Sequence, residues 1–301
     1  MFAERATCEL CGCSDAKVLY AESFSRGKTF RFIDDYYASR IPRSVLEQGQ
    51  YVLRQCPSCR FIWQGEILDD VNLDRLYSHW IDENASARKY AERHLDELAE
   101  LVHQISAVPY LLKMSAKDIR VLDFGAGWGR WCQIANAIGL EAWAAEVSGA
   151  RIAHMRSLGV PICPDIFTET GCFHFINAEQ VFEHLPDPRR YFDELASLLA
   201  PGGVMRISVP DGSGFEKQLC TGTWRPQKDA VHPLEHVNCY TPTSLRALAR
   251  GRDIRVVAAW KVCHAYYRCL VRGSGSLKTL KNAVASLSAG VVFFQRRLRD
   301  E

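Results

Sequence analysis

Short apolar runs alternate with helical patterns from residue 120 onward. "RVLDF", "EAWAAEV", "FHFINAE" and "VMRISVPD" have the length and composition of strands. "RWCQIANAIG", "GARIAHMRSLG" and "PRRYFDELASLLAPGG" have the spacing of helices that end at glycine. "VPICPD" predicts a short third strand and "IRVVAAW" a last one. Because such alternation forms βαβ units, we expect an α/β fold: a Rossmann-like, mostly parallel sheet with helices on both faces.

The chain before residue 120 has a different pattern. β-prone runs such as "AKVLYA" and "QYVLRQC" lie among cysteines, and residues 84 to 106 place Tyr90, Leu95, Leu98, Val102 and Ile105 on one helix face. After "RGSGS" the chain is basic and mildly amphipathic. We therefore expect a small cysteine-bearing domain at residues 1–65, a helical linker at 66–112, the main domain at 113–270 and a basic carboxy-terminal tail at 271–301.

Composition changes this picture little. Hydrophobic residues make up 48% and the formal net charge is +2, so the chain can bury a core and has no strong field for nucleic acid. "MFAERATCEL" lacks the apolar run of a signal peptide, and no stretch reaches transmembrane length. Twelve cysteines without an export signal predict a reducing compartment, the cytoplasm. The basic tail predicts weak peripheral membrane contact, or packing on its own domain or a second subunit, so monomer and homodimer both stay open.

The stretch "DFGAGWGR" follows the first strand of the main domain. Gly125, Gly127 and Gly129 permit positive φ and let a ligand lie against the main chain, and the next helix offers free amides. Glu146 ends the following strand, where an acid can bind a ribose diol. The alternative, a tight turn that binds nothing, does not explain this acid. The combination predicts a nucleoside-binding site.

Asp123 decides between two nucleoside ligands. A dinucleotide site normally reads G-x-G-x-x-G, whereas this chain reads D-x-G-x-G-x-G. A carboxylate there would repel a pyrophosphate but would attract the amino group of S-adenosyl-L-methionine. We therefore expect the sulfonium cofactor rather than NAD.

Residues 118 to 260 resemble class I S-adenosylmethionine-dependent methyltransferases. "VLDFGAGWG" is similar to their first motif, and "EHLPDP" with "LAPGG" is similar to a later signature. "HPLEHVNCYTPTSLRAL" resembles a subgroup with an amino-terminal zinc ribbon that acts on sugars or small metabolites. "RGRDIRV" departs from the family pattern, and the large carboxy-terminal domain of the sugar C-methyltransferases is not matched, which argues against carbon methylation. The cofactor-binding residues that the motif and the resemblance imply are Asp123, Phe124, Gly125, Ala126, Gly127, Gly129, Glu146, Val147, Asp165, Ile166, Glu179 and Gln180.

Two cysteine pairs near the amino terminus have the spacing of metal knuckles. Cys8-x-x-Cys11 and Cys56-x-x-Cys59 can supply four thiolates to one Zn²⁺. Such a site is closed to water, so we expect a structural zinc. Cys13 competes with Cys11 for the ion, and a set of free buried cysteines is the alternative interpretation.

Three side chains are candidate catalytic residues. Methylation of a hydroxyl benefits from a general base, and Glu183, His184 and His236 lie in segments that should reach the carboxyl edge of the sheet. Each histidine also has a structural interpretation, in which it braces a loop or bonds a backbone carbonyl. His232 precedes a proline and is interpreted as a turn residue.

These observations predict a methyltransferase that modifies an oxygen or nitrogen of a small or sugar-like acceptor, such as a nucleotide-linked sugar or polysaccharide precursor. One alternative is an RNA base methyltransferase, against which the modest charge argues. The other is a non-catalytic scaffold that binds the cofactor.

Overall fold

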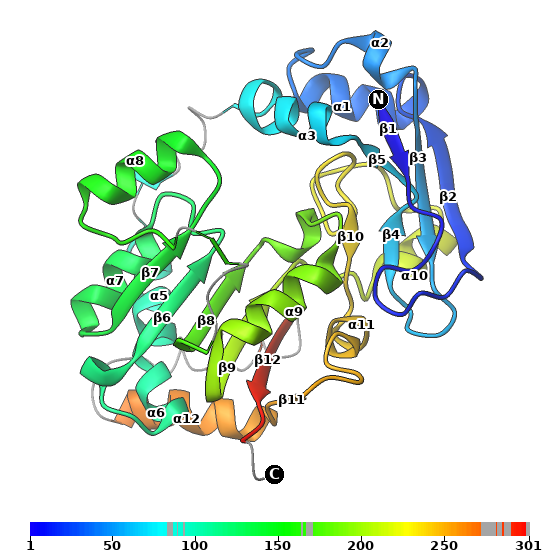
Figure 1. Cartoon of the computed structure of the whole chain (residues 1–301). Coiled ribbons are helices and arrows are strands. Elements are labelled where there is room, and N and C mark those ends of the chain that lie inside the picture. Colours follow the sequence, from blue (N-terminus) through cyan, green and yellow to red (C-terminus); the bar gives the residue numbers. More distant parts are fainter. Residues whose placement is uncertain are drawn as a thin grey trace. The chain divides into compact units, whose positions relative to one another are not determined.

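The chain forms two compact units, which are described separately (Figure 1). The computed structural model describes residues 1–82, 87–88, 90–92, 94–163, 165–166, 171–271, 281, 285 and 290–298. We call the two units the ribbon unit and the sheet unit. The ribbon unit comprises Met1–Lys89, Glu183–Pro188 and Val209–Ala247, and the sheet unit comprises Tyr90–Phe182, Arg189–Ser208 and Leu248–Glu301.

The sheet unit is built on a six-stranded sheet with the order β11-β12-β9-β8-β6-β7. The pairs β9–β8, β8–β6 and β6–β7 are parallel, while β12 runs antiparallel to both β9 and β11. The expected mostly parallel sheet is therefore confirmed. The strands are β6 (Arg120–Phe124), β7 (Glu141–Ala145), β8 (Phe173–Glu179), β9 (Leu199–Ser208), β11 (Ile254–Val256) and β12 (Val291–Arg296).

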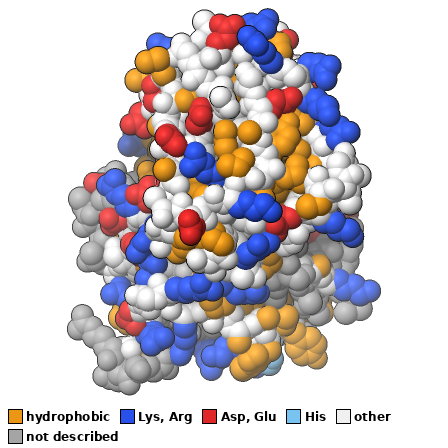
Figure 2. All heavy atoms as spheres, turned by 90° about the vertical axis from the view of Figure 1, so that its right-hand side faces the viewer, with side chains coloured by type: hydrophobic (Ala, Val, Ile, Leu, Met, Phe, Trp, Pro, Cys, Tyr) orange, Lys and Arg blue, Asp and Glu red, His pale blue; other side chains and the backbone are white. Residues whose placement is uncertain are grey.

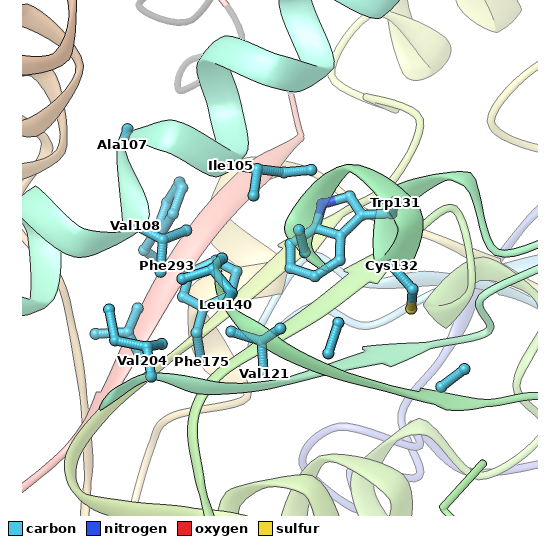
Figure 3. Close-up of a cluster of buried hydrophobic side chains, with 14 of the residues drawn as sticks. Ile105, Ala107, Val108, Val121, Trp131, Cys132, Leu140, Phe175, Val204 and Phe293 are labelled. Atoms are coloured by element: carbon cyan, nitrogen blue, oxygen red, sulfur yellow. The ribbon is translucent and has the colours of Figure 1, made fainter. Parts of the chain in front are cut away.

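Helices cover both faces of this sheet. On one face, Trp131 stacks on Phe175 of β8, and Phe293 belongs to the same buried cluster (Figure 3). The next residue on β12, Phe294, points to the opposite face, where its ring centroid lies 5.0 Å from that of Phe192 on α9. The helical elements are α5 (Leu95–Ser106), α6 (Val108–Leu112), η2 (Ala116–Asp118), α7 (Arg130–Ile138), α8 (Gly149–Ser157), α9 (Pro188–Leu198) and α12 (Ala259–Val271).

The helix expected over residues 84 to 106 differs from prediction. Residues 83–86, 89 and 93 lie outside the described part, and α5 begins only at Leu95, after the extended residue His94. Ile105 is fully buried, but the Leu95 side chain is 82% exposed. The predicted apolar face is wrong at Leu95, because the extended backbone at His94 interrupts the helical phase.

Three other sequence expectations of the main domain and tail need correction. "VPICPD" contributes a single bridge at Ile162 rather than a strand, and Pro161 beside it has no N–H to donate. The strand "IRVVAAW" ends at Val256, and Ala259 already begins α12, which the sequence analysis missed. In the expected tail, Val291–Arg296 forms β12 between β9 and β11, so these residues belong to the sheet. Among the described residues, no helix has the length and hydropathy that a membrane span requires.

The ribbon unit is built on an antiparallel four-stranded sheet with the order β10-β4-β3-β2 and a β1–β5 pair. Its β10 comes from the segment Val209–Ala247 and pairs with β4. This segment was expected in the main domain at 113–270; instead it packs in the ribbon unit, where Trp224 and Leu234 share a core with Phe24 and Tyr51. The elements are β1 (Phe2–Glu4), β2 (Lys17–Ser23), α1 (Gly27–Tyr36), α2 (Arg43–Leu46), β3 (Gln50–Gln55), β4 (Ile62–Gln64), β5 (Glu66–Leu68), α3 (Asp70–Arg75), η1 (Leu76–Trp80), η3 (Phe182–His184), α10 (Phe215–Cys220), β10 (Asn238–Cys239) and α11 (Pro242–Ala247).

Candidate functional site

The glycine turn joins the end of β6 to α7. Gly125, Gly127 and Gly129 have φ values of +73°, +56° and +78°, which only glycine adopts readily. A Cβ on Gly125 would lie 2.4 Å from the Val181 side chain, whereas one on Gly127 would meet nothing within 4 Å. The main chain at Gly127 is therefore bare on a side that the protein itself leaves open.

Glu146, just after β7, is tied to this turn. Its Oε2 accepts a hydrogen bond of 2.8 Å from the Gly127 amide, and its Oε1 accepts bonds of 2.8 Å and 3.1 Å from the amides of Val147 and Ser148. Arg151 Nη1 lies 3.6 Å from Oε2 and adds a positive charge. The ends of two neighbouring parallel strands thus meet at one carboxylate.

Asp123 is buried at one end of a polar chain that crosses three strands. Its Oδ1 accepts a hydrogen bond of 2.8 Å from Asn177 Nδ2, and Asn177 Oδ1 accepts one of 2.9 Å from Arg206 Nη1. Arg206 also pairs with Glu179. Burial raises the pKa of Asp123 to about 7, against the lowering effect of the Asn177 hydrogen bond. A cation that binds beside this carboxyl would favour its ionised form.

A hollow of about 420 Å³ lies above these groups in the sheet unit. Both polar and aromatic side chains line it, as expected of a site for a small organic ligand. Among the lining residues are Asp123, Gly125, Asn177, Glu179, Tyr90 and Trp128.

In the ribbon unit, the four predicted cysteines form one cluster. The Sγ atoms of Cys8 and Cys59 lie 3.5 Å apart, as do those of Cys11 and Cys56, and all four lie within 4.8 Å of one another. Sulfur atoms bound to one tetrahedral zinc are roughly 3.8 Å apart. The cluster could therefore hold a structural Zn²⁺, and Cys13 is outside it.

Glu183, His184 and His236 also come together in the ribbon unit. One ligand atom from each lies within 4.8 Å of the others, although η3 carries the first two and His236 precedes β10. His184 Nδ1 donates to the Glu235 carbonyl at 3.0 Å, and His236 Nδ1 donates to the Asp229 carbonyl. Because a carbonyl only accepts, each Nδ1 carries the hydrogen and each Nε2 keeps its lone pair. Burial lowers the pKa of His184 to about 4 and that of His236 to about 3, so both rings are neutral at pH 7.

His232 lies in a turn, as expected: its amide donates to the Asp229 carbonyl at 3.2 Å, and its carbonyl accepts from the His236 amide at 3.0 Å. Its side chain is fully buried, and the rings of Phe32, Tyr36 and His236 lie 5.3 Å, 4.6 Å and 5.4 Å from its ring, centroid to centroid. Burial lowers its pKa to about 2. We interpret it as a core histidine.

Comparison with known families gives the same result as the geometry of the sheet unit. A family described as "Methyltransferase domain" matches residues 85–259, more than half of the chain. The chain belongs to this family. The match includes the glycine turn and Glu146, and it confirms the resemblance to methyltransferases noted in the sequence.

The individual relatives of this chain are distant. The "Ubiquinone biosynthesis O-methyltransferase" of Xanthomonas campestris pv. campestris (strain B100) is 26% identical over 108 residues, which cover 32% of this chain and 45% of that protein. The enzyme of the same name from Psychrobacter cryohalolentis is 26% identical over 155 residues, 47% of this chain and 54% of that protein. The chain thus spans about half the length of the curated relatives it matches.

Two solved structures share the fold. The plantazolicin methyltransferase BpumL, in complex with a pentazolic desmethylPZN analog and SAH, has a TM-score of 0.52 at 13% identity, covering 76% of this chain and 95% of that chain. The plantazolicin methyltransferase BamL, in complex with a triazolic analog and SAH, has a TM-score of 0.51 at 16% identity, covering 75% and 94%. The expected Rossmann-like fold is confirmed.

The candidate site in the sheet unit contains predicted and unpredicted residues. Phe124, Ala126 and Gly129 belong to the turn segment, and Gln180, with φ of +53°, follows β8. Asp165 and Ile166 follow the bridge at Ile162. Sequence reasoning missed Tyr90, Trp128 and Arg206. Two of them could have been found from their positions in the sequence. Trp128 lies inside the glycine motif, and Arg206 is a charged residue on a strand that was expected to be buried.

Proposed function

We propose that this protein transfers the methyl group of S-adenosylmethionine to an oxygen or nitrogen of a small acceptor. The observation that carries the proposal is the buried Asp123 in a hollow beside the bare glycine turn, with Glu146 at the next strand end. An acid there suits a cationic amino group and disfavours a pyrophosphate. Family membership supports methyl transfer as the reaction.

The residues present fit this cofactor. The carboxylate of Glu146 would bind the ribose hydroxyls, and Asp123 with Glu179 would face the amino group. Val147, whose side chain is 96% exposed, and the pair Asp165 and Ile166 would flank the adenine. When bound, the cofactor supplies an electrophilic methyl group, and the protein's part is to hold it against the turn and align the acceptor.

Glu183, His184 and His236 are proposed as the residues that activate the acceptor. His184 follows Glu179 by five residues, so a short segment of chain joins these side chains to the end of β8. The names of the relatives favour oxygen as the acceptor atom. An oxygen acceptor needs help in losing its proton, which an amine does not need to the same extent. The acceptor itself is proposed to be a small hydroxylated molecule, with sugar-like compounds as the first to test.

A small acceptor is favoured over RNA. Figure 2 shows basic, acidic and hydrophobic side chains mixed over one face of the molecule. The net charge is only +2. Binding to a phosphate backbone relies on clustered cationic side chains.

In the ribbon unit we propose one structural Zn²⁺ held by Cys8, Cys11, Cys56 and Cys59. The sulfur spacing supports it, and four thiolates leave no position for water or acceptor. Its role is then to stabilise the ribbon unit.

The test has two steps. Calorimetry should detect binding of S-adenosylhomocysteine, and labelled S-adenosylmethionine should transfer its methyl group to a compound in fractionated cell extract or in panels of nucleotide-linked sugars and catechols. Absence of binding to S-adenosylhomocysteine, with clear binding of a nicotinamide dinucleotide, would refute the proposed cofactor. Binding without transfer to any fraction would favour the non-catalytic scaffold.

A further inference from the structure

We propose that Glu183, His184 and His236 bind one divalent transition-metal ion, separate from the zinc of the cysteine cluster. The three ligand atoms lie within 4.8 Å of one another and come from two segments of the ribbon unit. The inference rests on the proposed role of these side chains in activating the acceptor, and it replaces an imidazole base with a cation.

The distances fit an ion better than direct hydrogen bonding. His184 Nε2 lies 4.0 Å from Glu183 Oε1, which is too far for a hydrogen bond. Ligand atoms around a tetrahedral zinc at about 2.1 Å are roughly 3.4 Å apart. His184 is partly exposed, with 24% of its side chain accessible, so its ring has room to close the roughly 0.6 Å between these two distances.

Backbone carbonyls hold both rings in the orientation of metal ligands. A metal-bound histidine usually donates its other N–H to a carbonyl or carboxylate, which fixes the tautomer and directs the lone pair at the ion. His184 and His236 both do this from Nδ1, to Glu235 and Asp229. Their rings lie at 76° to each other with centroids 4.9 Å apart, so the two rings are not stacked.

The ligand set indicates which ions to expect. Two imidazole nitrogens with one carboxylate suit Zn²⁺, Fe²⁺, Co²⁺ or Ni²⁺, whereas Mg²⁺ prefers oxygen ligands only. Three protein ligands leave at least one position open, as in catalytic sites and unlike the closed cysteine cluster.

An open position suits the proposed reaction. An acceptor hydroxyl bound there would have a lowered pKa, so its O–H bond would break and the proton would pass to water. The oxygen would then form a bond to the methyl carbon while the carbon–sulfur bond broke, and the electron pair would stay on sulfur. Acceptor hydroxyl and S-adenosylmethionine thus give methyl ether, S-adenosylhomocysteine and one proton.

Metal stoichiometry tests this inference without any need for methyl transfer. The full chain is stripped with chelator, reloaded with Zn²⁺ or Co²⁺, freed of excess ion and measured by mass spectrometry of the metal. We expect two ions per chain in the wild type and one in each of Glu183→Gln, His236→Ala and Cys56→Ser. The Co²⁺ that remains in Glu183→Gln should show the absorption of a thiolate site, and that in Cys56→Ser should not. His79→Ala, at an exposed histidine outside the trio, is the matched control and should keep two ions.

Every outcome decides the question. One ion in the wild type, with a thiolate spectrum, overturns the inference, and so do two ions in both Glu183→Gln and His236→Ala. If Cys56→Ser loses both ions because the ribbon unit unfolds, the wild-type stoichiometry and the ion count and Co²⁺ spectrum of Glu183→Gln still decide. S-adenosylhomocysteine binding, measured on the same samples, reports on the sheet unit, so failure of the proposed cofactor site is seen separately.

Discussion

The sheet unit and the ribbon unit differ in how their polar side chains are built into the fold. In the sheet unit, Asp123 lies on β6 and Glu146 comes just after β7. These strands are parallel neighbours, so the pairing of the main chain brings the two residues together. In the ribbon unit, the Cys8–Cys59 and Glu183–His236 groups join segments that are about 50 residues apart in sequence. In the sheet unit, backbone topology therefore places the polar side chains of the site. In the ribbon unit, side chains from distant segments meet in two clusters, the four cysteines and the Glu183–His236 group.

The difference predicts separate sources of stability. The sheet unit buries continuous clusters such as that around Phe175 and Val121 (Figure 3). The ribbon unit has an aromatic core, around Tyr51 and Phe24, and a cluster of four thiols that is unstable as a group unless an ion holds it. Predictions that separate the two units test this comparison most directly.

The largest effect is expected for Cys56→Ser. Loss of one thiolate should abolish the structural zinc site and lower the free energy of unfolding of the ribbon unit by several kcal/mol. The total for a folded protein is only about 5–15 kcal/mol, so this loss is large. Hydrogen exchange should then show lost protection in β3 and β4, while S-adenosylhomocysteine still binds the sheet unit. Cys13→Ser is the matched control and should leave both unchanged. Equal damage from the two variants would contradict the assignment of the four ligands.

A smaller effect separates the two ends of α5 in the sheet unit. Ile105→Ala should lower the free energy of unfolding by about 2–5 kcal/mol, because it leaves a cavity at a fully buried position. Leu95→Ala should change it by less than about 0.5 kcal/mol, because that side chain is 82% exposed. Urea titration followed by tryptophan fluorescence measures both. Comparable losses of unfolding free energy in the two variants would instead support the single continuous apolar helix face that the sequence pattern predicted.

The sequence predicted the sheet unit well where neighbours in sequence determine structure. Strands at Arg120–Phe124 and Phe173–Glu179, and the glycine turn between strand and helix, follow from local pattern and φ requirements. β12 was missed because its apolar run lies among cationic residues, and only its pairing with β9 and β11 identifies it as a strand.

The ribbon unit was predicted only in part. Cysteine spacing identified the four clustered thiols, because paired knuckles carry their own signal. The pairing of β10 with β4 joins residues more than 170 positions apart in the sequence, and no local sequence pattern predicts it. The same long-range closure brings His236 to Glu183 and fixes the histidine tautomers, so the sequence could name these residues but not their arrangement.

The next prediction tests the cofactor side of the comparison. Gly127→Ala and Gly159→Ala both place a Cβ at positive φ, +56° and +73°, with nothing within 4 Å, so each should cost a similar 1–2 kcal/mol or so of stability. If a ligand lies against the turn, only Gly127→Ala should also weaken S-adenosylhomocysteine binding. The expected loss of affinity is about tenfold, which corresponds to about 1.4 kcal/mol. Calorimetry measures the affinities. An equal change in both variants would mean that backbone strain, rather than ligand contact, explains the loss.

The smallest effect concerns the pH dependence of cofactor binding. Burial raises the pKa of Asp123 to about 7, so the free protein loses its carboxylate charge as pH falls through that value. A cofactor ammonium group favours the ionised form, so affinity should rise with pH. If only the ionised form binds, the apparent Kd for S-adenosylhomocysteine should be about tenfold weaker at pH 6 than at pH 8. Asp123→Asn should bind weakly at both values with no such slope, whereas Glu97→Gln, at another acid that lines the hollow, should keep the wild-type slope. A flat wild-type profile would mean that Asp123 does not face the ammonium group, and the charge argument for this cofactor would then depend on Glu179 alone.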